Sequence, residues 1–226
     1  MPFAQRPDAR IWWDQDGTGD PILLIMGHAY GADMWYRTAP ELAASYRVIR
    51  FDNRGAGRSS DPPGPYPMRL MAEDALAVLD AAGAASAHVY GVSLGGAIAL
   101  QLALDHPGRA EDQQIVRRTR SSGRGRRGQI TGAAGFDVTG RLAEIRVPTL
   151  VMHGARDRIV PAANAQRLAD GIAGARLVMF PDAGHAYTTD VTQAANQEVL
   201  HFLAGLSGAA GGSRTGARPA ASTVDT

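Results

Sequence analysis

The sequence lacks cysteine, any long apolar run and an excess of charge of either sign. Without cysteine, disulfides and cysteine catalysis are excluded. No apolar run approaches the roughly 20 residues that span a bilayer, and residues 1–10 contain no apolar core of signal-peptide length. The formal net charge of +1 indicates nothing about partners. We therefore expect a soluble, cytoplasmic protein.

The remaining composition is that of one globular domain with a tail. Hydrophobic residues make up 45% of the 226 residues and charged residues 20%, which is ordinary for a soluble protein. Abundant alanine, glycine and arginine are typical of a GC-rich bacterial genome. Residues 207–226 are rich in Gly, Ala and Ser and are predicted to be a disordered tail. Residues 1–206 are enough for one domain with a sizeable core.

Short apolar runs alternate with helical patterns along residues 1–206, which predicts an α/β fold with a mostly parallel sheet. The continuous apolar run of residues 21–26 is typical of a strand covered on both faces. The strand near the N-terminus is expected to be antiparallel. The predicted strands are residues 10–13, 21–26, 47–51, 87–90, 148–152 and 176–180, and the predicted helices are residues 70–81, 94–105, 162–172 and 192–206.

Residues 110–135 interrupt this alternation. Six arginines fall between Arg117 and Arg127, interleaved with Gly and Ser, and no strand-like apolar run is present. This composition favours a solvated, irregular connector. A nucleic-acid-binding arm is a weaker alternative, because the segment has no aromatic residues for stacking on bases. A third alternative is an out-of-frame or spliced segment in the gene.

The pentapeptide of residues 91–95, Gly-Val-Ser-Leu-Gly, places Ser93 between a predicted strand and a predicted helix. This is the context of a nucleophile elbow, in which small flanking residues allow a sharp turn and expose the serine at the tip of the sheet. The N–H groups at the start of the helix can stabilise a developing oxyanion. A chance glycine-rich turn is the alternative.

A serine hydroxyl needs a base to remove its proton, and the base needs a partner that orients it. His185 lies on the loop after the strand of residues 176–180, and Asp157 follows the strand of residues 148–152. The ends of parallel strands meet at one edge of the sheet. The chain order is therefore Ser93, Asp157, His185, as stated for hydrolases with this elbow. Taken singly, either residue could be an ordinary loop residue.

Two further groups are predicted near this site. The backbone N–H of Leu94, together with that of His28 after the strand of residues 21–26, is expected to form the oxyanion hole. Trp35, in the Met-Trp-Tyr run that follows the oxyanion loop, is a weaker candidate for a substrate contact. Packing in the core is its alternative.

These segments resemble the single-domain α/β-hydrolase superfamily of esterases, lactonases and cofactor-free haloperoxidases. The turn of residues 51–59 (FDNRGAGRS) resembles the D-x-R-G-x-G-x-S turn of that superfamily and is interpreted as structural. The resemblance implies an α/β-hydrolase fold and hydrolysis of a small-molecule ester or lactone by a Ser93–His185–Asp157 triad. It implies no cofactor, no metal, no nucleic acid and no membrane.

The resemblance covers residues 10–107 and 136–206 and departs from the superfamily between them. Where relatives have a core strand and a helical cap, this chain has the arginine-rich segment, so the strand is expected to be missing and the cap reduced or absent. Three outcomes are open. Residues 113–116 or 129–131 supply a makeshift strand, the sheet closes up, or the site is disturbed.

Two other functions remain open at this stage. The same triad could carry out perhydrolysis, a haloperoxidase reaction or acyl transfer. Alternatively, the chain could be a hydrolase-like protein that keeps the three residues but has lost their geometry, because fold alone does not establish function.

Overall fold

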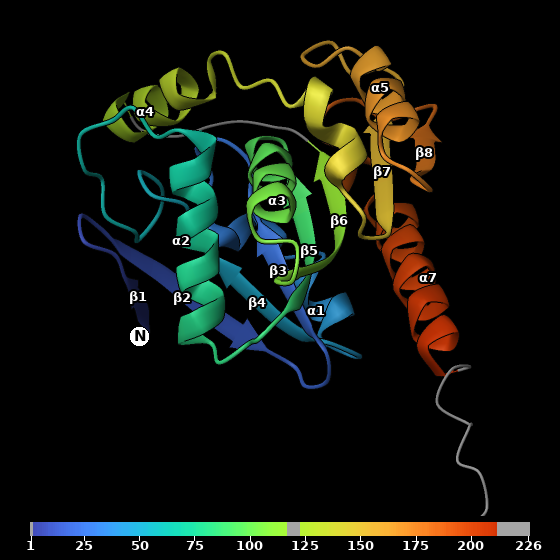
Figure 1. Ribbon diagram of the computed structural model, residues 1–226, viewed down its shortest axis with the longest axis horizontal. Helices are drawn as coiled ribbons and strands as arrows, with labels where there is room; N and C mark the ends of the chain where they lie inside the picture. Colours follow the sequence, from blue (N-terminus) through green and yellow to red (C-terminus); the bar gives the residue numbers. More distant parts are fainter. Residues whose placement is uncertain (1, 117–122, 212–226) are drawn as a thin grey trace, which may run out of the picture.

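The computed structural model describes residues 2–116 and 123–211 of the chain. Its centre is an eight-stranded sheet in the order β1-β2-β4-β3-β5-β6-β7-β8 (Figure 1). Strands β3 to β8 run parallel, and β2 is antiparallel to both β1 and β4. The strands are β1 Phe3–Gln5, β2 Arg10–Asp16, β3 Pro21–Ile25, β4 Arg47–Phe51, β5 Ala87–Val92, β6 Ala110–Val116, β7 Thr149–Gly154 and β8 Arg176–Phe180.

Helices cover both faces of this sheet, as its strand pattern requires (Figure 1). Successive side chains of a strand point to opposite faces. Leu23 of β3 accordingly packs with α2 and α3, whereas Leu24 packs with α1 and α7. The helices are α1 Ala39–Leu42, α2 Met68–Ala81, α3 Leu94–Asp105, α4 Gly123–Ala133, α5 Ala163–Gly171, α6 Tyr187–Asp190 and α7 Thr192–Gly211, with 3₁₀ helices η1 Ala32–Trp35 and η2 Thr139–Glu144.

The α/β class, all six predicted strands and all four predicted helices are confirmed, with ends that differ by a few residues. The antiparallel strand near the N-terminus is confirmed as β2. Helix α7 continues to Gly211, so the predicted tail does not begin at residue 207. Residues 212–226 of that tail lie outside the described residues.

The prediction of an irregular connector at residues 110–135 is wrong for most of the segment. Residues 110–116 form β6, which pairs in parallel with β5 on one side and β7 on the other. Residues 123–133 form α4. Of the three outcomes left open, the first is observed, because residues 113–116 lie within a strand that fills the expected gap. Residues 117–122 lie outside the described residues.

Helix α4 packs closely on the loops after β3 and β4. Gly125 lies so near Gly55 that a Cβ on either glycine would overlap the backbone of the other, and Gly128 lies against the ring of Tyr66. A helix with little apolar surface can pack here because its glycines permit close backbone contact. The described chain between β6 and β7 contains α4 and η2 as its helices, so the cap is reduced.

Gln129 of α4 is completely buried and joins this helix to both loops. Its Oε1 accepts a hydrogen bond from the Ala29 N–H (2.8 Å), and its Nε2 donates one to the Arg54 carbonyl (2.8 Å). Arg54 is itself buried and is held by Asp74, with donor–acceptor distances of 2.5 and 2.7 Å. The structural interpretation of the turn at residues 51–59 is thereby confirmed.

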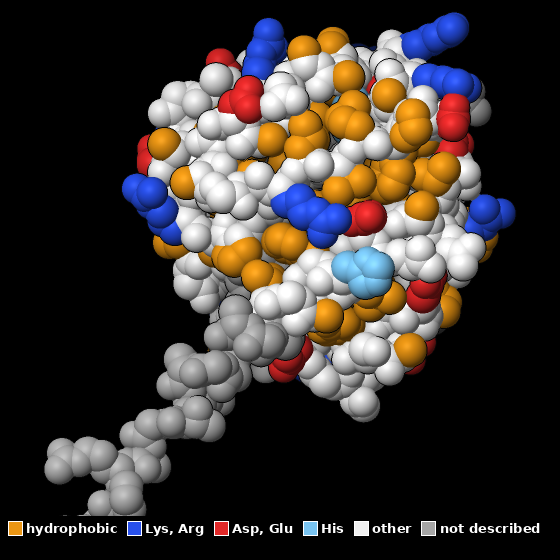
Figure 2. Space-filling view, turned by 90° about the vertical axis from the view of Figure 1, so that its right-hand side faces the viewer, with side chains coloured by type: hydrophobic (Ala, Val, Ile, Leu, Met, Phe, Trp, Pro, Cys, Tyr) orange, Lys and Arg blue, Asp and Glu red, His pale blue; other side chains and the backbone are white. Residues whose placement is uncertain are grey.

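On the face that carries α5, β8 and α7, hydrophobic side chains lie among separate positive and negative groups (Figure 2). The positive side chains stand apart from one another on this face. Within the described ranges, no helix is both long and apolar enough to cross a membrane.

We predict that Gln129→Leu lowers the free energy of unfolding by about 2 kcal/mol or more. The leucine would leave the Ala29 N–H and the Arg54 carbonyl buried without their partner, and each such loss costs about 1–3 kcal/mol. Urea unfolding followed by circular dichroism measures the change. The matched control is Gln166→Leu on the exposed face of α5, for which a change within about 0.5 kcal/mol is expected. Equal effects of the two substitutions would contradict the bridging role.

Candidate active site

Ser93 occupies a strained turn between β5 and α3. Its backbone angles are φ 63° and ψ −123°, a region that non-glycine residues rarely adopt. Strain of this kind persists where the surroundings enforce it and is frequent at active sites. A Cβ on Gly91 would overlap the backbone of Gly95, and a Cβ on Gly95 would overlap the carbonyl of Ile25. Both flanking glycines of the pentapeptide are therefore required by packing.

The turn presents Ser93 at the first turn of α3, where helix N–H groups have no carbonyl partner within the helix. Ser93 is 4% exposed, and its Oγ is buried with no hydrogen-bond partner among the described residues. The N–H of Leu94 is the first of this helix. Buried hydroxyls normally find partners, so an Oγ that the backbone turn holds without one is a candidate nucleophile.

Asp157 and His185 lie together, as the sequence predicts. His185 Nδ1 and Asp157 Oδ2 are 2.5 Å apart, and both side chains are almost entirely buried. Two main-chain hydrogen bonds hold their loops against each other, from the Ala155 N–H to the Phe180 carbonyl and from the Arg156 N–H to the Ala183 carbonyl. Asp157 and His185 are thus held together by main-chain hydrogen bonds as well as by their own contact.

The Asp157 carboxylate is set up to stay ionised. Its Oδ1 accepts hydrogen bonds from the N–H groups of Ile159 (2.7 Å) and Val160 (2.9 Å). Burial raises the pKa of this carboxyl, but the hydrogen bonds from Val160, His185 and Ile159 outweigh burial and hold the pKa below its usual value of 3.8. A carboxylate in this position fixes the His185 tautomer with Nδ1 protonated, which turns Nε2 into the proton acceptor.

A second histidine approaches the same carboxylate, a contact that the sequence analysis missed. His153, in β7, has its Nε2 3.4 Å from Asp157 Oδ2 and donates a hydrogen bond to the Val160 carbonyl at 3.2 Å. Its position four residues before Asp157 was visible in the sequence. Nothing in the sequence showed that the two side chains face each other.

The loop that carries His28 follows β3, as predicted for an oxyanion loop. Ala29 has a positive φ of 80°, and its N–H is bound by Gln129. The imidazole Nε2 of His28 donates to the Arg126 carbonyl of α4 at 3.0 Å. The His28 side chain is therefore directed to α4, and the candidate oxyanion donor at this residue is its backbone N–H.

Trp35, the weaker candidate for a substrate contact, lies in the hydrophobic core. It is 1% exposed, packs on Tyr90 with ring centroids 4.9 Å apart, and belongs to the core on the α7 side of the sheet. Of the two interpretations offered for this residue, core packing is the one that the structure has. The sequence alone cannot distinguish core packing from a substrate contact for Trp35, because the direction of its side chain depends on the turn at η1.

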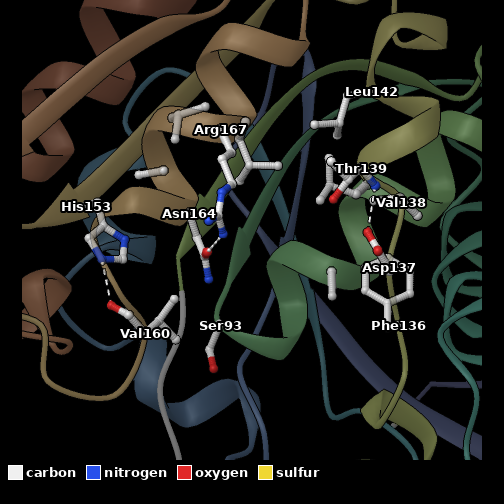
Figure 3. Close-up of a pocket in the computed structure, with 15 residues that line it drawn as sticks. Ser93, Phe136, Asp137, Val138, Thr139, Leu142, His153, Val160, Asn164 and Arg167 are labelled. Carbon is white, nitrogen blue, oxygen red and sulfur yellow. Dashed lines mark hydrogen bonds between the residues drawn. The ribbon is translucent and has the colours of Figure 1, made fainter.

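A cavity of about 470 Å³ lies beside Ser93, between α3, η2, β7 and α5 (Figure 3). Its walls are mostly apolar, and polar groups come from a few side chains that include His153, Asn164 and Arg167. Sequence analysis did not find the contribution of residues 136–142, because this linker has no motif and enters the site only through the fold. Among the described residues, no group of three or more His, Cys, Asp or Glu side chains is placed to bind a metal ion.

Comparisons with known proteins agree with this architecture. Residues 20–117 match the family model described as alpha/beta hydrolase fold, and residues 133–213 match the model described as TAP-like protein. The unmatched interval between the two models falls on the arginine-rich segment.

Related proteins match over almost their whole length. A protein of Azorhizobium caulinodans named carbamate hydrolase RutD is 31% identical over 259 aligned residues, which cover 89% of this chain and 98% of that protein. This aligned stretch is longer than the whole chain of 226 residues, so the relative carries a segment that is absent here.

Solved structures of hydrolases are also similar to this chain over most of its length. A hydrolase from Pseudomonas aeruginosa superposes with a TM-score of 0.84 at 29% identity, covering 89% of this chain and 97% of that one. An enzyme described as degrading N-acyl homoserine lactone superposes with a TM-score of 0.80 at 28% identity, covering 89% of this chain and all of that one. The sheet order, the elbow and these matches together show that the chain belongs to the α/β-hydrolase family and is a hydrolase of that type.

Proposed function

We propose that the protein is a serine hydrolase that cleaves a carboxylic ester or lactone, with Ser93 as nucleophile, His185 as general base and Asp157 as its orienting acid. The observation that carries this proposal is the buried contact between Asp157 and His185 at the sheet edge where the strained elbow presents Ser93. The chain order Ser93, Asp157, His185 supports the same assignment. The lactone-degrading enzyme among the structural relatives supports the substrate class.

The reaction follows from the roles of these groups. His185 Nε2 takes the proton of Ser93 as its Oγ attacks the carbonyl carbon, and Asp157 stabilises the imidazolium that forms. The backbone N–H groups of Leu94 and His28 stabilise the negative oxygen of the tetrahedral intermediate. The imidazolium then protonates the leaving alkoxide. In the second half, His185 removes a proton from water, which releases the acyl group from Ser93.

A carbamate is a second candidate substrate, because the relative that spans this chain at 31% identity is named as a carbamate hydrolase. A carbamate also presents a carbonyl to the serine, and its tetrahedral intermediate needs the same oxyanion donors. Nitrogen donation into that carbonyl makes it less electrophilic than an ester. Esters are therefore the better first substrates for an assay.

We predict that Ser93→Ala abolishes hydrolysis of p-nitrophenyl butyrate, with a fall in kcat of at least about a thousandfold, because loss of a triad nucleophile removes the covalent step. A fluorophosphonate probe should label the wild-type protein at Ser93, as read by mass spectrometry, and should not label the variant. Ser45→Ala, at an exposed position, should retain full activity and labelling. Retention of esterase activity by Ser93→Ala would overturn the assignment.

The lowered pKa of Asp157 predicts a pH-dependent contribution to stability. A carboxyl whose pKa is lower in the folded state stabilises the fold above its unfolded pKa, and this contribution is lost as the pH falls through the folded pKa. Asp157→Asn should therefore destabilise the protein at pH 6, and the difference from wild type should shrink towards pH 3. Urea unfolding at several pH values measures it.

The matched control for this experiment is Asp182→Asn. Asp182 is exposed and pairs with an exposed Arg156, and such surface pairs contribute little. Its effect should be small at every pH. If the difference in the free energy of unfolding between wild type and Asp157→Asn grew as the pH fell, the lowered pKa would be contradicted.

A further inference from the structure

Among the described residues that line the cavity beside Ser93, Arg167 is the one lysine or arginine. Arg167, on α5, extends into the cavity in Figure 3. Arg167 is an exposed residue, and most of the other described residues that line the cavity are apolar, including Leu100, Leu142 and Val151. An arginine that projects into an apolar cavity next to a nucleophile is placed to recognise a complementary group on the substrate.

Arg167 has no acidic partner among the residues that the structure describes. Its Nη1 donates a hydrogen bond to the side-chain carbonyl of Asn164 at 3.1 Å. This bond uses the Asn164 oxygen and so turns the amide nitrogen of Asn164 into the cavity, as Figure 3 shows. The Asn164 amide nitrogen and the guanidinium N–H groups other than the one bound to Asn164 are donors with no hydrogen-bond acceptor among the described residues.

The opposite wall carries Asp137, the acidic residue among the described side chains that line the cavity. Asp137 lies across from α5 in Figure 3, and its Oδ1 accepts a hydrogen bond from the Thr139 N–H at 2.8 Å. Hydrogen bonding from the Thr139 side chain, and then from its N–H, lowers the pKa of Asp137, so the group is ionised. A negative substrate group is therefore repelled from the η2 wall and attracted to the α5 wall.

We propose that Arg167 and Asn164 form a carboxylate-binding subsite, so that the preferred substrate carries a carboxylate on the part remote from the scissile carbonyl. The proposal rests on the hydrolase function proposed above for Ser93. Guanidinium matches carboxylate with two parallel hydrogen bonds, and the apolar walls favour the hydrocarbon chain between the two ends of the substrate.

The test compares two esters that differ by one carboxylate, p-nitrophenyl butyrate and the mono-p-nitrophenyl ester of glutaric acid. The wild-type protein should have a higher kcat/KM for the glutarate ester than for the butyrate ester. Arg167→Gln should lower that value by about ten- to hundredfold, mainly through KM, because a charge-assisted hydrogen bond is lost. The same variant should change kcat/KM for the butyrate ester by less than about threefold.

Two further variants isolate the charge of the cavity. Arg69→Gln removes an arginine whose side chain is 78% exposed on α2, away from the cavity, and should leave both esters unaffected. Asp137→Asn removes the opposing carboxylate and should raise kcat/KM for the glutarate ester without raising it for the butyrate ester. A wild-type preference for butyrate, or an equal loss on both esters in Arg167→Gln, would overturn the subsite.

A binding experiment with glutarate tests the subsite separately from the catalytic assignment. Glutarate should raise the melting temperature of wild type and of Ser93→Ala, since a ligand that binds the folded state stabilises it. It should have little effect on Arg167→Gln, and glutaramide should have little effect on any of them. Absence of stabilisation by glutarate in wild type refutes the subsite, whereas stabilisation without ester hydrolysis refutes the proposed reaction alone.

Discussion

The main-chain hydrogen bonds of β6 hold the two halves of the candidate site in register. Ser93 follows β5 on one side of this strand, and Asp157 follows β7 on the other. Neighbouring strands lie about 4.8 Å apart, so β6 sets the spacing of the elbow and the acid. A sheet that had closed up by one strand would have moved Asp157 and His185 towards β5. The triad proposed above requires this spacing, because Asp157 and His185 follow strands on the far side of β6 from Ser93.

The strand that fixes this spacing is also the element that sequence reasoning judged absent. The strands at residues 21–26 and 148–152 are recognisable because they are buried on both faces and read as apolar runs. Residues 110–116 have no such run. Strand pairing, however, is made by backbone N–H and carbonyl groups, which every residue except proline supplies. β6 therefore forms by backbone pairing with its two neighbours, β5 and β7. The side-chain pattern of residues 110–116 does not predict this pairing.

The same limit explains which parts of the site were predicted. The Ser93 turn and the Asp157–His185 contact could be predicted because each residue follows a recognisable strand and because chain order constrains the candidates. Gln129 and Arg167 have no such signal, since a glutamine in an arginine-rich segment and an arginine on an exposed helix face are ordinary by themselves. Trp35 shows the converse error, because proximity in sequence to the oxyanion loop did not bring its side chain to the cavity.

The reduced cap changes which elements shape the candidate site. Helix α4 buries little apolar surface, and it is held instead by close glycine contacts and by the polar bridge of Gln129 to the loops after β3 and β4. Hydrogen bonds are directional, whereas apolar packing is not. The hydrogen bonds of Gln129 therefore couple the position of α4 to the conformation of the candidate oxyanion loop. The cavity walls then come from η2 and α5, which belong to the core domain. Selectivity in this chain would accordingly depend on charges fixed to rigid core elements, and such charges discriminate substrates by complementarity rather than by closure of a lid.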